Sequence, residues 1–402
     1  RVSCSPEDYA SGSWSYRPQF PEGNVSMTRP EDAFLFNRFE GCASSREFWW
    51  HLGADNAVQW DRYPNVTDWR WVPGEKCLGI RQLDGADLVR DLVEMGGWLI
   101  LGDSMTENHF FSLSCLMYPH VRATPIYDQD AGYDRAWPQN IYLSPNSPLI
   151  LTLRFPPGFS IERTPLVTFR RVDLLLSEPE LISLHASHYS DLYDVDPAFR
   201  LFADDVPVWT LSPSYYMPIF TSPLPDANYA AMIVSTAGHW TTMKFLGYRD
   251  ENRPGSGIAG VLDFFAVSMQ WWASEVQRML DLHRAAHPKT EDGRLVADKK
   301  VIVRAYQSGH TDCHNHRKPL DRYVPAEHNQ WNWASIWEFN RVFKEITSKP
   351  AYPDIHFLSI DRPGTLRPDA HSTSDCLHVM AGAGVSEGWT HYIWHYLTRE
   401  TS

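Results

Sequence analysis

Residues 98–104 read Trp-Leu-Ile-Leu-Gly-Asp-Ser, an apolar run that ends abruptly at a glycine, an aspartate and a serine. A continuous apolar run is typical of a strand that is buried on both faces of a parallel sheet. The carboxyl ends of such strands form the edge at which open α/β sheets bind ligands. Gly102 permits a sharp turn that exposes Ser104, and a helix predicted over Thr106–Tyr118 directs its N-terminus to the same place. The stretch therefore predicts both a fold class and the position of a site.

Strands and helices alternate after residue 97, which predicts an α/β domain over residues 96–402 with a central parallel sheet covered on both faces. The predicted strands are Trp98–Leu101, Leu149–Phe155, Ala231–Ser235, Val301–Tyr306 and His356–Ile360. The predicted helices are Thr106–Tyr118, Ile258–Ala286, Asn332–Ile346 and Val385–Leu397. Residues 156–228 are rich in proline and aromatic residues and resist assignment, so we interpret them as an insertion near the site.

Residues 1–95 differ from the rest because they are rich in Gly, Pro and Trp and show few periodic segments. Three cysteines lie there, and we expect a small, loop-rich N-terminal lobe stapled by disulfides. The even number of six cysteines and the sequons at Asn24 and Asn65 favour a glycoprotein of the secretory pathway. The chain begins at Arg1, so we expect that a signal peptide or an anchor has been removed.

Composition narrows the function classes. The chain has 402 residues, of which 43% are hydrophobic and 21% charged, as in globular proteins. A formal net charge of −13 without a dense run of Lys or Arg excludes nucleic acid as a partner. No apolar stretch is long enough to span a membrane. Most of the 17 Trp, 18 Tyr and 19 Phe residues belong to the core, and some are expected to line a sugar-binding cleft.

The late segment Asp375-Cys-Leu-His378 supplies the partners that a serine nucleophile needs. Nucleophilic catalysis requires a base beside the hydroxyl and a third group that orients the base. We therefore predict a triad of Ser104, His378 and Asp375. Asp369 and His371 form a rival pair within the same segment. The first pair is preferred because its spacing and the helix that follows place both side chains at one mouth.

Further groups follow the predicted strands. The oxyanion of an acyl-transfer reaction needs hydrogen-bond donors, and the candidates are Ser104 itself, Gly238 and Asn108. Gly238 alternatively makes only a turn, and Asn108 alternatively is an ordinary surface residue. The candidate substrate-binding residues are Arg304, His310, His239 and Trp240.

The sequence does not support two other hypotheses, a zinc site and a phosphate-binding loop. His310, Cys313, His314 and His316 are dense enough to suggest zinc, but Cys313 is needed for an even disulfide count. The Gly255-Ser-Gly257 stretch lacks the lysine and the strand-then-helix context of a phosphate loop. We therefore predict no metal and no bound cofactor.

Together these motifs resemble the trichome-birefringence-like/PC-esterase family of the SGNH (GDSL-type) superfamily, in its fungal form, over nearly the whole chain. The matching motifs are Cys4 with Ser11-Gly-Ser-Trp14, Trp69-Arg-Trp-Val-Pro-Gly-Glu-Lys-Cys77, Gly102-Asp-Ser104 with Asn108 and Cys115, Gly238-His-Trp240, Arg304 with His310, and Arg367-Pro-Asp-Ala-His371 with Asp375-Cys-Leu-His378. The chain departs from the family pattern at Glu107, at Ser308 and at residues 381–384, which indicates a different donor or acceptor preference.

The resemblance implies an SGNH-like three-layer α/β/α domain, with the active site in a cleft beside the N-terminal lobe. It also implies the disulfides Cys4–Cys77, Cys42–Cys115 and Cys313–Cys376. The implied chemistry is an acetyl-Ser104 intermediate, which makes the protein a polysaccharide O-acetyltransferase whose acetyl donor is not specified. The alternative is a secreted carbohydrate O-acetylesterase with the same triad, and a third reading is a non-catalytic carbohydrate-binding protein. The expected partner is an acetylated cell-wall polysaccharide or oligosaccharide, in the Golgi lumen or outside the cell.

Overall fold

A computed structural model describes residues 3–20, 25–127, 137–287, 298–326 and 330–401. Asn24, one of the two predicted glycosylation sites, lies outside the described residues. The other site, Asn65, belongs to the 3₁₀ turn η3 (Asn65–Thr67), and its side-chain amide donates a hydrogen bond to the Arg317 carbonyl.

Within the described residues, seven strands form one mixed and mostly parallel sheet in the order β4-β5-β6-β3-β7-β8-β9. The parallel strands are β3 (Gly97–Gly102), β6 (Val167–Arg171), β7 (Tyr229–Ser235), β8 (Lys300–Arg304) and β9 (Ile355–Leu358). At one edge β5 (Gln139–Leu143) runs antiparallel to its neighbours β4 (Val121–Thr124) and β6, so the predicted central parallel sheet is extended there by a mixed edge. After β3 the chain forms β4, β5 and β6, which lie on one side of β3 in the sheet. It then crosses to β7, which lies on the other side of β3. The carboxyl end of β3 is thus the topological switch point, where α/β sheets place ligands.

The apolar run from Trp98 to Leu101 lies in β3, and all six residues of this strand are buried. The predicted strand Leu149–Phe155 is wrong. Pro148–Leu151 forms a short 3₁₀ helix, η4, which begins with Ser147 as N-cap and proline in its first turn, and Leu151 is 89% exposed. The strand in this part of the sheet is instead β6. Since β6 lies inside residues 156–228, the interpretation of that whole segment as an insertion is also wrong.

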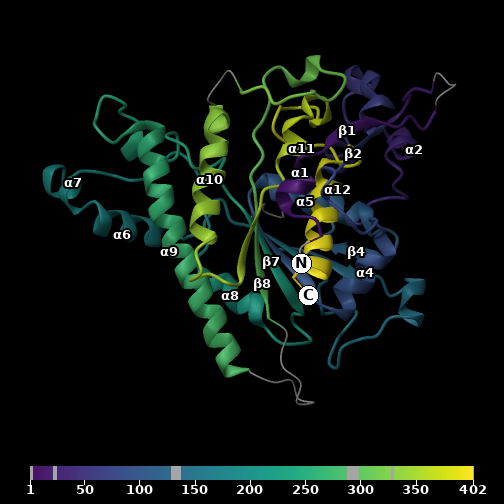
Figure 1. Ribbon diagram of the computed structural model, residues 1–402, viewed down its shortest axis with the longest axis horizontal. Helices are drawn as coiled ribbons and strands as arrows, with labels where there is room; N and C mark the ends of the chain where they lie inside the picture. Colours follow the sequence, from purple (N-terminus) through teal and green to yellow (C-terminus); the bar gives the residue numbers. More distant parts are fainter. Residues whose placement is uncertain (1–2, 21–24, 128–136, 288–297, 327–329, 402) are drawn as a thin grey trace.

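Helices cover both sides of the sheet (Figure 1). On one side lie α6 (Glu178–His188), α7 (Ser190–Val195), α9 (Gly257–Ala286) and α10 (Ile336–Thr347), and α8 (Pro213–Thr221) packs on α9; on the other lie α4 (Gly85–Glu94), α5 (Ser104–Leu116) and α12 (Val385–His395). The four predicted helices are confirmed with shifted ends. The largest shift is at α10, because Trp331 and Asn332 adopt positive φ angles of 55° and 58° and break the helix predicted from Asn332.

The N-terminal segment carries a small antiparallel sheet of β1 (Ser13–Tyr16) and β2 (Trp69–Val72). Its short helices are α1 (Pro6–Ala10), α2 (Ala33–Asn37) and α3 (Phe48–His51), and the 3₁₀ turns are η1 (Pro30–Asp32) and η2 (Ala57–Arg62). The segment packs onto the C-terminal part of the chain, since the Trp14 indole donates a hydrogen bond of 2.8 Å to the Pro363 carbonyl of α11 (Arg362–Thr365). The two chain ends also meet, because the Ser3 hydroxyl donates to Glu400 (Figure 1).

All six cysteines are paired, as Cys4–Cys77, Cys42–Cys115 and Cys313–Cys376. These are the three pairs that the family resemblance implies. Among the described residues, no helix combines the length and the apolar character that crossing a membrane requires.

Candidate active site

Ser104 is the first residue of α5, and only Asp103 separates it from the end of β3 at Gly102. Asp103 caps the helix, because its carboxylate accepts a hydrogen bond of 3.0 Å from the Met105 N–H. The helix therefore begins at Ser104 and not at Thr106. This position leaves the Ser104 side chain half-buried at the edge of the sheet, and the helix leaves the Ser104 N–H without an intrahelical acceptor.

The structure brings together the three residues of the predicted triad. The Ser104 hydroxyl lies 2.7 Å from His378 Nε2, and His378 Nδ1 lies 2.7 Å from an Asp375 carboxylate oxygen. With Nδ1–H donating to Asp375, the neutral ring presents an unprotonated Nε2 to the Ser104 hydroxyl. This is the arrangement in which a histidine takes the proton of an attacking serine.

The Asp375 carboxylate is fixed by its own loop. Its second oxygen accepts hydrogen bonds of 2.9 Å from the backbone N–H groups of Leu377 and His378. Burial raises the pKa of Asp375, but the hydrogen bonds and charge of His378 and the backbone donors outweigh burial and lower that pKa to about 2. The group is therefore a carboxylate at neutral pH and holds His378 in one orientation.

The rival pair lies behind this loop. The Asp369 carboxylate is paired with the Arg367 guanidinium at 2.9 and 3.0 Å, and both side chains are buried. The fully buried His371 donates from Nδ1 to the His378 carbonyl at 3.0 Å, and its Nε2 lies 2.6 Å from His310 Nδ1. Asp369 and His371 therefore support from within the loop that carries Asp375 and His378, the candidate catalytic loop, and do not face Ser104.

The candidate oxyanion donors Gly238 and Asn108 have different surroundings in the structure. Gly238 lines a cavity together with Ser104, and a Cβ atom there would lie 2.4 Å from the Tyr306 hydroxyl, so only glycine fits. Asn108 is buried, and its amide donates to His51 Nδ1 at 2.8 Å and accepts from the Val379 N–H. Both ends of this amide are engaged within the fold, one Nδ2–H of Asn108 is left as a donor, and its role toward the oxyanion stays a prediction.

Two of the four predicted substrate-binding residues, Arg304 and Trp240, do not line the cavities at Ser104. Arg304 is 1% exposed and its guanidinium lies 3.9 Å from the Trp389 ring of α12, so it points into a helical layer. Trp240 is fully buried, stacks on Phe245 and donates from its indole to Thr236. Both are therefore packing residues and do not reach a substrate at Ser104.

His239 and His310 do line the cavity beside Ser104. The His239 ring lies between two carboxylates, at 3.6 Å from Asp103 and 3.4 Å from Asp173. Asp103 also accepts a hydrogen bond of 2.6 Å from the Tyr306 hydroxyl. Burial lowers the pKa of His239, although the charges of Asp173 and Asp103 oppose that shift. Residue 239 is thus held in place directly beside Gly238.

In the described part of the chain, two cavities meet at the triad, and Ser104, Asp375 and His378 line both. The first, of about 500 Å³, is also lined by Gly238, His239, Tyr306, His310, Trp331 and Trp333. The second, of about 630 Å³, is also lined by Glu47, Trp49, Trp50, His51, Asp55 and Glu107. The nucleophile is therefore accessible from two sides, each with tryptophan in its wall.

The residues of the second cavity were not predicted from the sequence. Trp50 donates from its indole to the Ser374 hydroxyl at 2.8 Å, and its ring centre lies 5.2 Å from that of His378. Glu107 is buried and forms an ion pair of 2.6 Å with Arg46. The tryptophan-rich run before His51 is a visible signal, but nothing in its spacing connects it with Ser104.

The dense histidine and cysteine segment does not form a zinc centre. Cys313, His314 and Cys376 come close together, but the two sulfur atoms are joined in a disulfide and cannot act as thiolate ligands. The disulfide instead ties the catalytic loop to the segment after β8, where the His310 N–H also donates to the Cys376 carbonyl at 2.9 Å.

Comparison of the chain with protein-family models gave no match, and a search of the curated proteins found no relative.

Proposed function

We propose that the protein is an SGNH-like enzyme that transfers acetyl groups to carbohydrate hydroxyls through an acetyl-Ser104 intermediate. The observation that carries this proposal is the pair of 2.7 Å contacts that joins Ser104, His378 and Asp375 at the switch point of the sheet. The resemblance to the trichome-birefringence-like/PC-esterase family supports the same chemistry.

The first half-reaction loads the serine. The Ser104 oxygen attacks the acetyl carbonyl of the donor while His378 Nε2 takes the hydroxyl proton. The N–H groups of Gly238 and Ser104 are placed to stabilise the negative oxygen of the tetrahedral intermediate. As the intermediate collapses, the bond to the donor alcohol breaks and His378 returns the proton to that leaving group.

The second half-reaction unloads the serine. A sugar hydroxyl loses its proton to His378, attacks the acetyl-Ser104 carbonyl and leaves as the acetyl ester, while His378 reprotonates Ser104. Two cavities that share the triad provide room for a donor on one side and an acceptor on the other. This room is what a transferase needs to bring a sugar hydroxyl rather than water to acetyl-Ser104.

The tryptophans in both walls, among them Trp50 and Trp333, favour a carbohydrate because aromatic faces stack on the apolar faces of pyranose rings. The three disulfides favour an oxidising compartment, for which we propose the Golgi lumen or the cell exterior.

The test follows isotope-labelled acetyl groups by NMR while the protein is incubated with acetylated and unacetylated xylan, mannan and glucan. We expect the label to move from an acetylated to an unacetylated chain in the presence of the wild type and not of Ser104→Ala. Release of all of the label as free acetate would show hydrolysis and assign the protein as a carbohydrate O-acetylesterase instead of a transferase. If the label neither moves to another chain nor is released, the proposal of an acetyl-group enzyme is wrong.

A further inference from the structure

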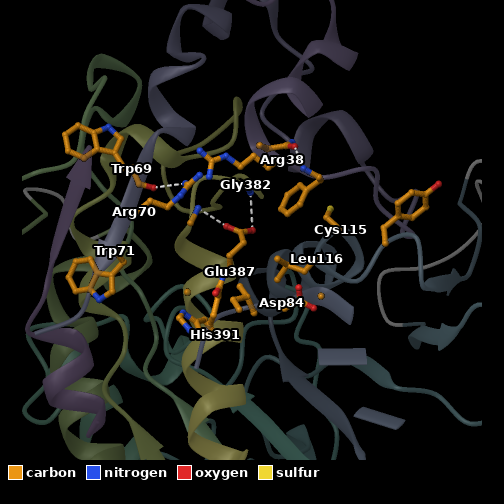
Figure 2. A pocket seen from close by; sticks show the side chains of 18 of the residues that line it. Arg38, Trp69, Arg70, Trp71, Asp84, Cys115, Leu116, Gly382, Glu387 and His391 are labelled. Carbon is orange, nitrogen blue, oxygen red and sulfur yellow. Dashed lines mark hydrogen bonds between the residues drawn. The ribbon is translucent and has the colours of Figure 1, made fainter. Parts of the chain in front are cut away.

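A separate cavity of about 850 Å³ lies between the N-terminal segment and α12. Figure 2 shows it bordered by Trp69, Arg70 and Trp71 of β2, by Cys115 and Leu116 at the end of α5, and by Glu387 and His391 of α12. Ser104 begins α5, and at about 1.5 Å per residue this helix places roughly 16 Å between the nucleophile and Cys115. The cavity therefore does not belong to the catalytic site.

Two arginines meet over this cavity. Figure 2 shows the side chains of Arg38 and Arg70 extending toward one another. Among the residues that the structure describes, neither forms an ion pair, and the hydrogen bonds of Arg70 are to the carbonyls of Thr67 and Trp69. Burial and the neighbouring Arg38 charge lower the pKa of Arg70, and the charges of Asp68 and Glu387 oppose that shift. Two like charges held together in this way favour an anion between them.

The carboxylates near the arginines are engaged elsewhere. Glu387 accepts hydrogen bonds from the Ser112 hydroxyl at 2.6 Å and from the N–H groups of Gly382 and Gly384 at 3.1 and 2.7 Å. Asp68 is buried and accepts from the Gln19 N–H, and Asp84 caps α4. These acids therefore leave the guanidinium N–H groups of Arg38 available to a ligand.

The aromatic wall beside the arginines is rigid. The Trp14 indole donates to Pro363, and the Trp71 indole donates to the Tyr9 carbonyl at 3.0 Å. The two rings meet edge to face with centres 5.5 Å apart. Rings fixed by hydrogen bonds lose little freedom when a ligand stacks on them. Such a wall suits a ligand with an apolar face, such as the C–H face of a sugar ring.

A further donor in the cavity has no partner. Asn37 lines the cavity and is 6% exposed, and its Nδ2 amide finds no hydrogen-bond acceptor within the described residues. An unsatisfied buried donor is costly, typically about 1–3 kcal/mol, unless a ligand or water accepts from it. A hydroxyl group of a ligand would provide that acceptor.

We propose that this cavity binds a carboxylate-bearing sugar unit of a glycan. The carboxylate lies between Arg38 and Arg70, the ring packs on Trp14 and Trp71, and a hydroxyl accepts from Asn37. If the proposed function holds, on which this consequence rests, an acidic polysaccharide anchored here is held with neighbouring units near Ser104.

The test measures binding by calorimetry to the full chain carrying Ser104→Ala, so that no turnover interferes. The probes are a glucuronate-bearing xylo-oligosaccharide, the neutral oligosaccharide of the same length, and inorganic phosphate. We expect the acidic oligosaccharide to bind more tightly than the neutral one, which can use only the cavities at Ser104, and Arg38→Gln to weaken binding of the acidic one at least about tenfold, because a charge-assisted hydrogen bond is lost. Arg341→Gln, which removes an exposed arginine of α10, is the matched control and leaves binding unchanged.

Equal binding of the neutral oligosaccharide, equal binding of phosphate, or an Arg38→Gln variant that binds like the wild type would each overturn the proposal. Arg38 is exposed and makes no hydrogen bond among the described residues, so we expect this variant to fold. Arg70→Lys, which keeps the charge, is a second variant with a smaller expected loss. In the active chain, Arg38→Gln is expected to raise KM for an acidic polysaccharide and to leave 4-nitrophenyl acetate turnover unchanged. Absence of that turnover in the wild type would instead count against the proposed function.

Discussion

The two ends of α5 carry sites with opposite arrangements of charge. At the N-terminal end every group of the triad is paired before a substrate arrives, with His378 between Ser104 and Asp375. At the C-terminal end Arg38 and Arg70 face a cavity without an ion pair within the described residues. Paired groups are fixed in the orientation that chemistry needs, whereas unpaired charges favour a ligand that neutralises them. This difference is the basis on which we propose chemistry at one end and recognition at the other.

The largest expected effect is on turnover, from a substitution at the N-terminal end of α5 alone. Ser104→Ala should lower acetyl-ester turnover by up to about 10⁶-fold, because no nucleophile remains. Turnover of 4-nitrophenyl acetate measures this, with Ser348→Ala at the end of α10 as the matched control. Binding of the acidic oligosaccharide at the other end should not change. Turnover of Ser104→Ala at the wild-type rate would contradict the assignment of the nucleophile.

The next prediction separates the two acidic residues of the catalytic segment. Asp375→Asn should lower turnover by about 10⁴-fold with a small change in stability, because the amide no longer holds the His378 tautomer. Asp369→Asn should instead lower the free energy of unfolding by about 3–5 kcal/mol, because the buried Arg367 loses its partner. Turnover and denaturant unfolding of both variants measure this contrast. A large loss of turnover in Asp369→Asn and a large loss of stability in Asp375→Asn would instead make Asp369 the carboxylate that orients the histidine.

A third prediction concerns the oxyanion donor. Gly238→Ala should lower turnover by about 10²-fold, because its Cβ would lie 2.4 Å from the Tyr306 hydroxyl and displace the Gly238 N–H. Adding Tyr306→Phe removes that oxygen and should restore part of the lost turnover, which a double-mutant cycle quantifies. Full activity of Gly238→Ala would exclude this N–H as an oxyanion donor.

The smallest effect is on the pH dependence of stability. The pKa of Asp375 is lowered from 3.8 to about 2, so its pairing stabilises the fold above about pH 4 and this contribution is lost as the pH falls toward 2. The difference in Tm between the wild type and Asp375→Asn should therefore shrink as the pH falls through this window. A difference in Tm that stays constant from about pH 5 to 2 would contradict the charged pairing of Asp375.

The sequence predicts the catalytic end of α5 well because its signals are local. An apolar run before Gly102 predicts a buried strand, and the short spacing of Asp375 and His378 predicts one hydrogen-bonded unit. The strand β6 was missed because it contains Thr168, Arg170 and Arg171 and so lacks a continuous apolar run.

Other errors come from side-chain direction and from distance along the chain. Arg304 ends a strand as predicted, but whether its side chain points to the sheet edge or to the Trp389 layer depends on packing that one sequence does not reveal. Trp50 and Glu107 reach the triad through a lobe whose position depends on tertiary contacts. The Arg38 cavity likewise joins residues from α2, β2 and α12, which no local pattern connects.

The central claim is that Ser104 carries the acetyl group. The most direct measurement is peptide mass spectrometry of the protein, mixed with an acetyl donor and quenched with acid within the first turnover. We expect the mass of one acetyl group on the peptide that contains Ser104, and none on that peptide in the His378→Ala variant. Turnover with no acetylated peptide, or with the acetyl group on another residue, would contradict the account.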